Sequence, residues 1–265
     1  MTQATEVLFP SSVDEAVAQF GDGEGVTVVA GGTIVVPEIT YGRLAPNRAL
    51  MLGGAGLDTI DDDGTTVTVG AGVPVSRLTE LADAVPALAQ CALNVADVEI
   101  RAQATVGGNL CTGHGLDAPR GDLQGAFLAL GATARSAGAG GERSEPLEEF
   151  LDARDGRLLL DVRFEKPAAS AFASLDYPHT HEYTVLAVTG VRTRDGAVRL
   201  AATGLAGQGR RLPSAEAAAG DLEAAGAAAL DDVELGDDAL ASAWYRSRAL
   251  PVLVRRVLSQ LEEAS

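Results

Sequence analysis

At residues 104–111 the chain reads Ala104-Thr105-Val106-Gly107-Gly108-Asn109-Leu110-Cys111, and it has a second glycine pair earlier, in Val28-Val29-Ala30-Gly31-Gly32-Thr33. In both segments we expect a short apolar approach of β type that leads into the two glycines and then into a small polar residue. Glycine lets the backbone turn with its N–H groups exposed and no Cβ in the way, which suits a phosphate or a diphosphate. We therefore expect two turns that hold one diphosphate from both sides.

A single glycine pair most often marks an ordinary turn. Here each pair is followed by a side chain, Thr33 or Asn109, that can hydrogen-bond a phosphate oxygen. No Gly-x-Gly-x-x-Gly stands between a strand and a helix, so the Rossmann fingerprint is missing. A dinucleotide would have to be held in another way.

Composition narrows the class of protein. The chain has 265 residues, 46% of them hydrophobic, which is enough for two cores, and its net charge of −17 disfavours nucleic acid and anionic membranes as partners. Two cysteines, Cys91 and Cys111, are too few for a disulfide scaffold, an iron–sulfur cluster or a four-cysteine zinc site. The first residues have no signal-peptide pattern and no apolar run reaches eighteen residues, so we expect a cytoplasmic protein without a membrane span.

Hydrophobic patterning predicts mixed helices and strands without strict βαβ alternation. Ser12 and Glu15 form a capping-box pattern ahead of a helix at 13–20, and Asp61-Asp62-Asp63-Gly64 indicates a hairpin. The first part of the chain, to about residue 57, is expected to hold strands at 7–10, 26–30 and 49–52. The next part is expected to hold strands at 66–69, 133–136 and 158–164 and helices at 75–84, 87–95, 122–130 and 147–151.

After a linker-like stretch at 166–169, the pattern changes to strands followed by helices. The strands are expected at 171–175, 184–192 and 198–203, and the helices at 215–219, 222–229 and 239–263, with Pro251 starting or kinking the last piece. An antiparallel sheet with a helical bundle is the simplest arrangement for residues 167–265.

Several segments, in this order, resemble the FAD-binding medium subunit of molybdenum hydroxylases, a family that includes bacterial xanthine dehydrogenases and the molybdenum-type carbon monoxide dehydrogenase. The longest is Ile100-Arg101-Ala102-Gln103-Ala104-Thr105-Val106-Gly107-Gly108-Asn109-Leu110. The others are Ala30-Gly31-Gly32-Thr33, Val69-Gly70-Ala71-Gly72-Val73, Asp122-Leu123, Tyr245-Arg246 and Val254-Arg255-Arg256.

The resemblance implies an α+β fold with a two-subdomain FAD-binding domain of the vanillyl-alcohol-oxidase (PCMH) type at 1–166, divided at about 57/58. A C-terminal flavoprotein domain with a small antiparallel sheet and a helical bundle follows at 167–265. FAD is the implied cofactor, and no metal site and no catalytic side chain are expected, because the flavin carries the chemistry.

The resemblance also implies the binding residues. Ala30, Gly31, Gly32 and Thr33 would wrap the FAD diphosphate from one side, and Gly107, Gly108 and Asn109 would reach it or the ribityl chain from the other, with Thr105 hydrogen-bonding nearby. Ile34 stands where the family usually has Asp or Ser, so a contact there is lost or comes from the backbone.

Four further residues, one acid and three in the segment 179–183, have more than one interpretation. Asp122 matches a family acid expected to bind a cofactor hydroxyl, but a helix N-cap ahead of Leu123 fits equally well. His179 and His181 lack an obvious third metal ligand, so surface or interdomain packing is favoured over a metal site. In the family this segment lies near the flavin ring, so a third interpretation is that His181 or Tyr183 lines the isoalloxazine.

For function, the resemblance implies an oxidoreductase subunit that passes electrons from iron–sulfur clusters through FAD to NAD, oxygen or a quinone. The partners would be a small 2Fe-2S subunit and a large molybdopterin subunit, in a dimer of heterotrimers. The scarcity of cysteine agrees with clusters on another chain.

Two alternatives stay open: a self-contained flavin oxidase of the same fold, and a non-catalytic ligand-binding or assembly module. Cys91 and Cys111 are expected to be packed residues, and Trp244 and Tyr245 to be core or subunit contacts.

Overall fold

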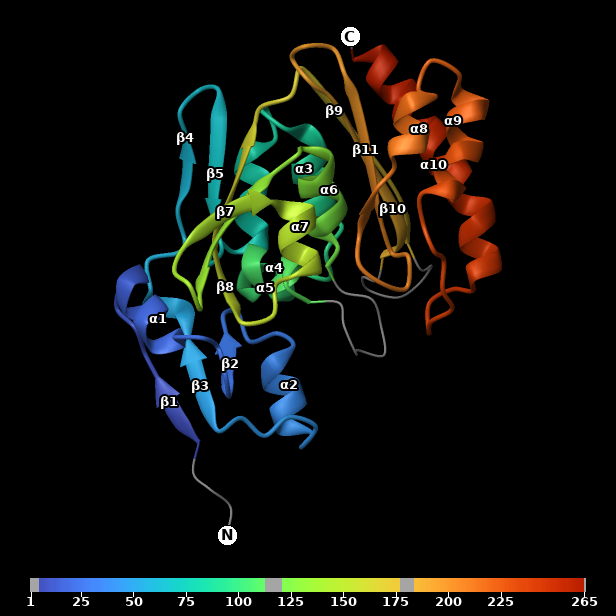
Figure 1. Ribbon diagram of the computed structural model, residues 1–265. Helices are drawn as coiled ribbons and strands as arrows, with labels where there is room; N and C mark the ends of the chain where they lie inside the picture. The colour runs from blue at the N-terminus through green and yellow to red at the C-terminus, as the bar shows by residue number, and fades with distance from the viewer. Residues whose placement is uncertain (1–4, 113–120, 177–183, 265) are drawn as a thin grey trace. The chain divides into compact units, whose positions relative to one another are not determined.

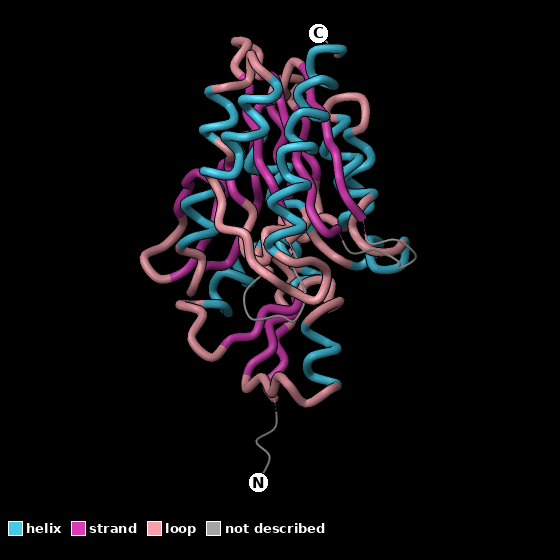
Figure 2. The backbone as a smooth tube through the Cα atoms, turned by 90° about the vertical axis from the view of Figure 1, so that its right-hand side faces the viewer, coloured by secondary structure: helices cyan, strands magenta, loops and turns pink. Residues whose placement is uncertain are grey.

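The computed structural model describes residues 5–112, 121–176 and 184–264, and the chain forms two compact units (Figure 1). Unit 1 comprises Met1–Val75, Glu99–Cys111 and Thr133–Arg163, and unit 2 comprises Ser76–Val98, Thr112–Ala132 and Phe164–Ser265. Helices and strands alternate irregularly in both units (Figure 2), as expected for an α+β protein. The domain boundaries expected at residues 57 and 166 stay predictions.

Unit 1 begins with a parallel three-stranded sheet in the order β1-β3-β2. Its strands are β1 (Glu6–Leu8), β2 (Val26–Val29) and β3 (Arg48–Met51), and its helices are α1 (Val13–Phe20) and α2 (Val35–Thr40). The predicted strands and the helix at 13–20 are confirmed. The hydroxyl of Ser12 accepts from the Glu15 N–H (3.2 Å), whereas the Glu15 carboxylate accepts from the N–H of Ser11 rather than from that of Ser12 (2.7 Å).

A five-stranded sheet in the order β4-β5-β8-β6-β7 follows. Its strands are β4 (Ile60–Asp62), β5 (Thr66–Gly70), β6 (Thr133–Gly138), β7 (Arg143–Pro146) and β8 (Arg157–Glu165), and α7 (Leu147–Asp152) comes directly after β7. The hairpin signal is confirmed, because the Asp63 carboxylate accepts from the N–H groups of Thr65 and Thr66 at 2.9 and 2.7 Å. Side chains of α1, β3, β6 and β8 form one hydrophobic core that includes Phe20, Leu50 and Leu160.

Four short helices lie between β5 and residue 112, and two predictions fail there. They are η2 (Val75–Leu81), α3 (Pro86–Leu93), α4 (Val98–Gln103) and α5 (Val106–Leu110). The segment expected as an α-helix at 75–84 is a 3₁₀ helix. The apolar approach at 100–101 is helical rather than β-like, so the second glycine pair lies in the first turn of α5. The reason is local: Thr105 adopts an extended conformation and its hydroxyl accepts from the N–H of Gly108 (3.1 Å), which caps a helix at this point.

Unit 2 is built on an antiparallel sheet in the order β12-β11-β10-β9. Its strands are β9 (Ala169–Asp176), β10 (Thr184–Arg192), β11 (Val198–Thr203) and β12 (Arg210–Arg211). Its helices, besides α3 and most of η2, are α6 (Leu123–Ala129), α8 (Pro213–Ala217), α9 (Leu222–Ala228), η3 (Ala229–Asp231) and α10 (Ala243–Glu263). The antiparallel sheet and the C-terminal helices are confirmed. In Figure 1, α3 and α6 lie on one face of the sheet and α10, with α8 and α9, on the other.

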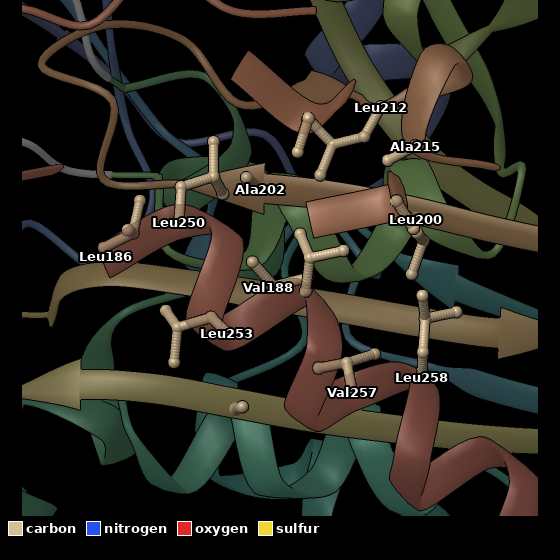
Figure 3. Close-up of a cluster of buried hydrophobic side chains, with 14 of the residues drawn as sticks. Leu186, Val188, Leu200, Ala202, Leu212, Ala215, Leu250, Leu253, Val257 and Leu258 are labelled. Atoms are coloured by element: carbon tan, nitrogen blue, oxygen red, sulfur yellow. The ribbon is translucent and has the colours of Figure 1, made fainter. Parts of the chain in front are cut away.

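Leucine and valine side chains of β10, β11 and α10 interdigitate between that sheet and the bundle (Figure 3). Leu186, Val188 and Leu200 from the strands meet Leu253 and Val257 from α10. This apolar stripe orients α10 with its opposite face toward solvent. No helix among the described residues has the length and hydrophobicity that crossing a membrane requires.

The start of α10 is tied to the preceding loop by Arg246, whose side chain is fully buried. Its guanidinium donates to the carbonyl oxygens of Gly236 (2.8 Å) and Ala241 (2.7 Å) and to the carboxylate of Asp238 (2.7 Å). Burial alone would raise the pKa of Asp238, but hydrogen bonds from Arg246 and from two backbone N–H groups outweigh it and lower that pKa. The buried charge is therefore paired with a carboxylate and hydrogen-bonded to the backbone.

Candidate functional site

The first glycine pair stands at the carboxyl end of β2, immediately before α2. Gly32 has φ +72°, a left-handed conformation that favours glycine, and its carbonyl oxygen accepts from the N–H of Val36 (3.0 Å). Ile34 occupies the N-cap position of α2, with no side-chain capping bond. The backbone therefore turns sharply between Ala30 and Ile34.

This turn exposes a row of backbone donors. Within the part of the chain that the structure describes, the N–H groups of Gly31, Gly32, Thr33 and Ile34 have no hydrogen-bond acceptor. All four residues are half-buried. Successive N–H groups in a tight turn form a concave site for an anion, and a phosphate bound there would satisfy donors that the protein itself leaves open.

The first turn packs directly against the segment that precedes the second glycine pair. A Cβ on Gly31 would lie 1.9 Å from the carbonyl oxygen of Gln103 and 3.0 Å from the Cα of Ala104. No side chain fits at that distance. The structure thus brings the two glycine segments of the sequence together within unit 1.

The two glycines of the second segment have different surroundings. The N–H of Gly107 donates to the carbonyl oxygen of Ala71 (2.8 Å), and a Cβ on Gly107 would lie 2.7 Å from the Cβ of Ala71. Among the described residues, a Cβ on Gly108 would meet only the hydroxyl of Thr105, at 3.0 Å, and Gly108 is the half-exposed residue of α5. Gly107 therefore allows α5 to pack closely, whereas Gly108 presents an open surface.

Thr105 and Asn109 flank that surface and are largely buried, 8% and 9% exposed. The N–H of Asn109 donates to the carbonyl oxygen of Thr105 (2.8 Å). The N–H groups of α5 that were expected to face a phosphate are thus used inside unit 1. A ligand would approach this segment over the Cα of Gly108.

The segment after β5, Gly70-Ala71-Gly72, supports the second glycine pair. A Cβ on Gly70 would lie 2.1 Å from the carbonyl oxygen of Leu57, and the N–H of Gly72 donates to the same oxygen (2.8 Å). Ala71 between them supports Gly107. The pattern Gly70-Ala71-Gly72 is visible in the sequence, but its supporting role was not predicted. Two glycines on either side of a small residue are a signal that could have predicted close backbone packing here.

Asp122 belongs to unit 2, where it directly precedes α6. It occupies the N-cap position of α6, as one of its two interpretations predicts, but it has helical backbone angles and its carboxylate makes no capping hydrogen bond. Its carbonyl oxygen accepts from the thiol of Cys91 (3.4 Å). Tyr183, His179 and His181 lie outside the described residues, and the expected contact of Tyr183 or His181 with a ring stays a prediction.

Cys91 is buried and Cys111 is half-buried. Burial, and to a lesser degree the charge of Asp122, raise the pKa of Cys91, and burial raises the pKa of Cys111 to about 11 although the charge of Arg154 opposes it. A thiol rather than a thiolate is present near neutral pH, so neither residue is an activated nucleophile. By contrast, Trp244 and Tyr245 are 68% and 46% exposed, so of their two expected roles the core one is wrong and the subunit contact stays a prediction.

Comparison with known proteins points to one family. Residues 3–164 match the family described as FAD binding domain in molybdopterin dehydrogenase. The chain is 26% identical to the 6-hydroxypseudooxynicotine dehydrogenase complex subunit alpha of Paenarthrobacter nicotinovorans, over 94% of this chain and 91% of that one. It is also 26% identical to the carbon monoxide dehydrogenase medium chain of Afipia carboxidovorans, over 95% and 94% of the two chains.

Solved structures show the same fold. A chain of carbon monoxide dehydrogenase from Hydrogenophaga pseudoflava superposes with a TM-score of 0.85 at 23% identity, covering 100% of this chain and 99% of that one. A chain of the reconstituted enzyme from Oligotropha carboxidovorans gives a TM-score of 0.86 at 23% identity, with 100% of both chains covered.

Proposed function

Because the chain belongs to the family of FAD-binding domains in molybdopterin dehydrogenases, we propose that it is the FAD-carrying electron-transfer subunit of a molybdenum hydroxylase complex. FAD is the cofactor of this family, and the expected α+β fold with a PCMH-type FAD domain is confirmed. The family match at 3–164 supports a FAD-binding domain at 1–166 and a second domain at 167–265.

The observation that carries the proposal is the row of open N–H groups at residues 31–34. Two phosphates carry several acceptor oxygens, and such donors complement them without any basic side chain. Ala30, Gly31, Gly32 and Thr33 would hold the diphosphate, and Ile34 would contribute its backbone N–H in place of a polar side chain.

The second glycine segment would close over the same ligand. Gly108 leaves room for close approach of the cofactor, and Thr105, Gly107 and Asn109 fix the position of that surface. Asp122, which makes no side-chain capping bond to α6, would bind a hydroxyl of the cofactor.

Bound flavin supplies both one-electron and two-electron redox chemistry, and the residues of this chain bind and orient it. Neither cysteine is an activated nucleophile, which agrees with a subunit whose chemistry belongs to its cofactor. The chain has two cysteines, which are too few to hold an iron–sulfur cluster.

We assign the electron donor to a small 2Fe-2S subunit and the substrate site to a large molybdopterin subunit, in a cytoplasmic dimer of heterotrimers. Relatives named as a complex subunit alpha and as medium chains support a multi-subunit assembly. The proposed terminal acceptor is NAD, oxygen or a quinone. In this proposal the large subunit determines the substrate, and so determines whether the complex resembles xanthine dehydrogenases or carbon monoxide dehydrogenases.

The test is to purify the complex from its native host and to follow the flavin absorbance during reduction by substrate. Bleaching of the flavin by substrate in the complex, and not in the isolated chain, is expected. A chain that oxidises a small substrate alone would instead be a flavin oxidase. A chain that retains no FAD in complex or alone would be a non-catalytic module.

A further inference from the structure

One face of α10 points away from the core of unit 2 and has an unusual composition. Tyr245, Arg248, Val252 and Arg256 recur at intervals of three and four residues, which places them on one side of the helix. All four are exposed, and Trp244 beside them is 68% exposed. We call these five residues the α10 face.

The α10 face is basic on an acidic chain. The guanidinium of Arg248 lies 5.8 Å from the centre of the Trp244 ring, and neither Arg248 nor Arg256 has a carboxylate partner among the described residues. The neighbouring Arg255, by contrast, pairs with Glu223 at 2.5 Å. On a chain of net charge −17, two arginines without ion pairs favour an anionic partner.

The face also contains a hollow. Leu175 of β9 and the α10 residues Tyr245, Ala249, Val252 and Leu253 line most of an open depression of about 220 Å³. Pockets for cofactors and drug-sized ligands begin at roughly 300 Å³. The hollow therefore suits one inserted apolar side chain, with Arg248 and Arg256 at its margin.

We propose that the α10 face docks an acidic segment of a partner subunit, in which one apolar side chain fills the hollow and flanking carboxylates pair with Arg248 and Arg256. Tyrosine, tryptophan and arginine are the side chains that most often anchor protein interfaces. The assignment rests on the proposed function only in taking the partner to be a subunit of the same complex.

A second copy of this chain fits less well. In a two-fold symmetric dimer each α10 face would meet its own equivalent, and that would place arginine opposite arginine. Like charges facing each other across an interface are destabilising. The charge pattern therefore selects a different, acidic polypeptide.

The test uses the full-length chain produced together with its partner subunits in the native host. The photoreactive residue p-benzoylphenylalanine replaces Tyr245, and in a matched control it replaces Tyr41, which is 72% exposed in unit 1. Irradiation followed by peptide sequencing identifies what lies on each surface. A cross-link from position 245 to a partner segment rich in Asp or Glu is expected, and none to that segment from position 41.

A charge reversal provides the second readout. Arg256→Glu is expected to lower the amount of partner that co-purifies by about tenfold or more. Arg163→Glu is the control, because Arg163 is also exposed and has no ion pair among the described residues. Its recovery of partner is expected to equal that of the unaltered chain.

A cross-link to a second copy, to a segment without carboxylates or to nothing would overturn the proposal, as would equal losses in both arginine variants. Flavin content, measured on the same samples, reports separately on the proposed function. A chain that carries FAD but forms no cross-link at position 245 contradicts only the docking proposal. A chain without FAD that does cross-link to an acidic partner contradicts only the cofactor assignment.

Discussion

The backbone of Gly31 lies directly against the carbonyl oxygen of Gln103, so that a Cβ at Gly31 would stand 1.9 Å from that oxygen. This contact joins the turn after β2 to the segment that leads into α5. It sets how closely the open N–H groups of residues 31–34 approach the surface at Gly108, and a side chain at position 31 would force them apart.

Gly31→Ala is expected to destabilise unit 1 by about 1–3 kcal/mol and to abolish FAD retention, because the added methyl group meets backbone that cannot rotate away. Urea denaturation and flavin absorbance measure the two effects. Gly53→Ala is the matched control, since Gly53 is exposed and a Cβ there has nothing within 4 Å. If Gly31→Ala behaved like Gly53→Ala, the close contact would have no energetic role.

The paired charges at the start of α10 predict a second stability effect. Arg246→Met is expected to cost about 3–5 kcal/mol, because it leaves the carboxylate of Asp238 without its buried partner. Arg255→Met is expected to cost only about 0–1 kcal/mol, because its partner Glu223 is exposed. Urea denaturation measures the free energy of unfolding of both variants. Equal decreases in the two variants would contradict a special contribution of the buried Arg246 to stability.

The same pair predicts acid sensitivity. The pKa of Asp238 is lower in the folded protein than its ordinary value of 3.8, so the unfolded chain binds a proton first as the pH falls. The stability that this carboxylate contributes is present above pH 3.8 and is lost as the pH falls through its folded pKa. Asp238→Asn is expected to flatten this part of the profile of unfolding free energy against pH. An unchanged slope would contradict the assignment.

The thiols predict the opposite pH dependence. Because the pKa of Cys111 is raised from 9.0 to about 11, the unfolded chain releases this proton before the folded one does, and stability is expected to fall between those two values. At pH 8, mass spectrometry after iodoacetamide treatment is expected to show modification of Cys91 and Cys111 only in urea. Rapid modification of either residue in the folded protein would indicate an activated thiolate.

Much of the fold could be predicted because its signals are local. The Asp63-Gly64 turn marks the β4–β5 hairpin. The apolar runs of β9, β10 and β11 are long enough for their hydrophobic pattern to identify them as strands. Short elements such as α2, β7 and β12 were missed, since two to six residues give little periodicity. The spacing left Trp244 as either a core residue or a subunit contact, because helical spacing does not say which of two possible faces meets the sheet.

The glycine pairs of the candidate site are visible in the sequence, but the atoms they approach are not. Gly31 meets Gln103 and Gly107 meets Ala71, and both contacts join segments far apart in the chain. Contacts of this kind override local propensity, so that only the structure distinguishes the supporting Gly107 from the open Gly108.

The central claim is that FAD lies over the two glycine segments, and Gly108→Asp tests it most directly. The new side chain would meet only the hydroxyl of Thr105 and would place bulk and negative charge against the expected diphosphate. Gly53→Asp adds the same group at an exposed glycine of unit 1. Bound FAD per chain, measured by absorbance after gel filtration alongside the melting temperature, is expected to fall to background in Gly108→Asp and to stay normal in Gly53→Asp, with both variants folded. A folded Gly108→Asp variant with normal flavin content would contradict the assignment.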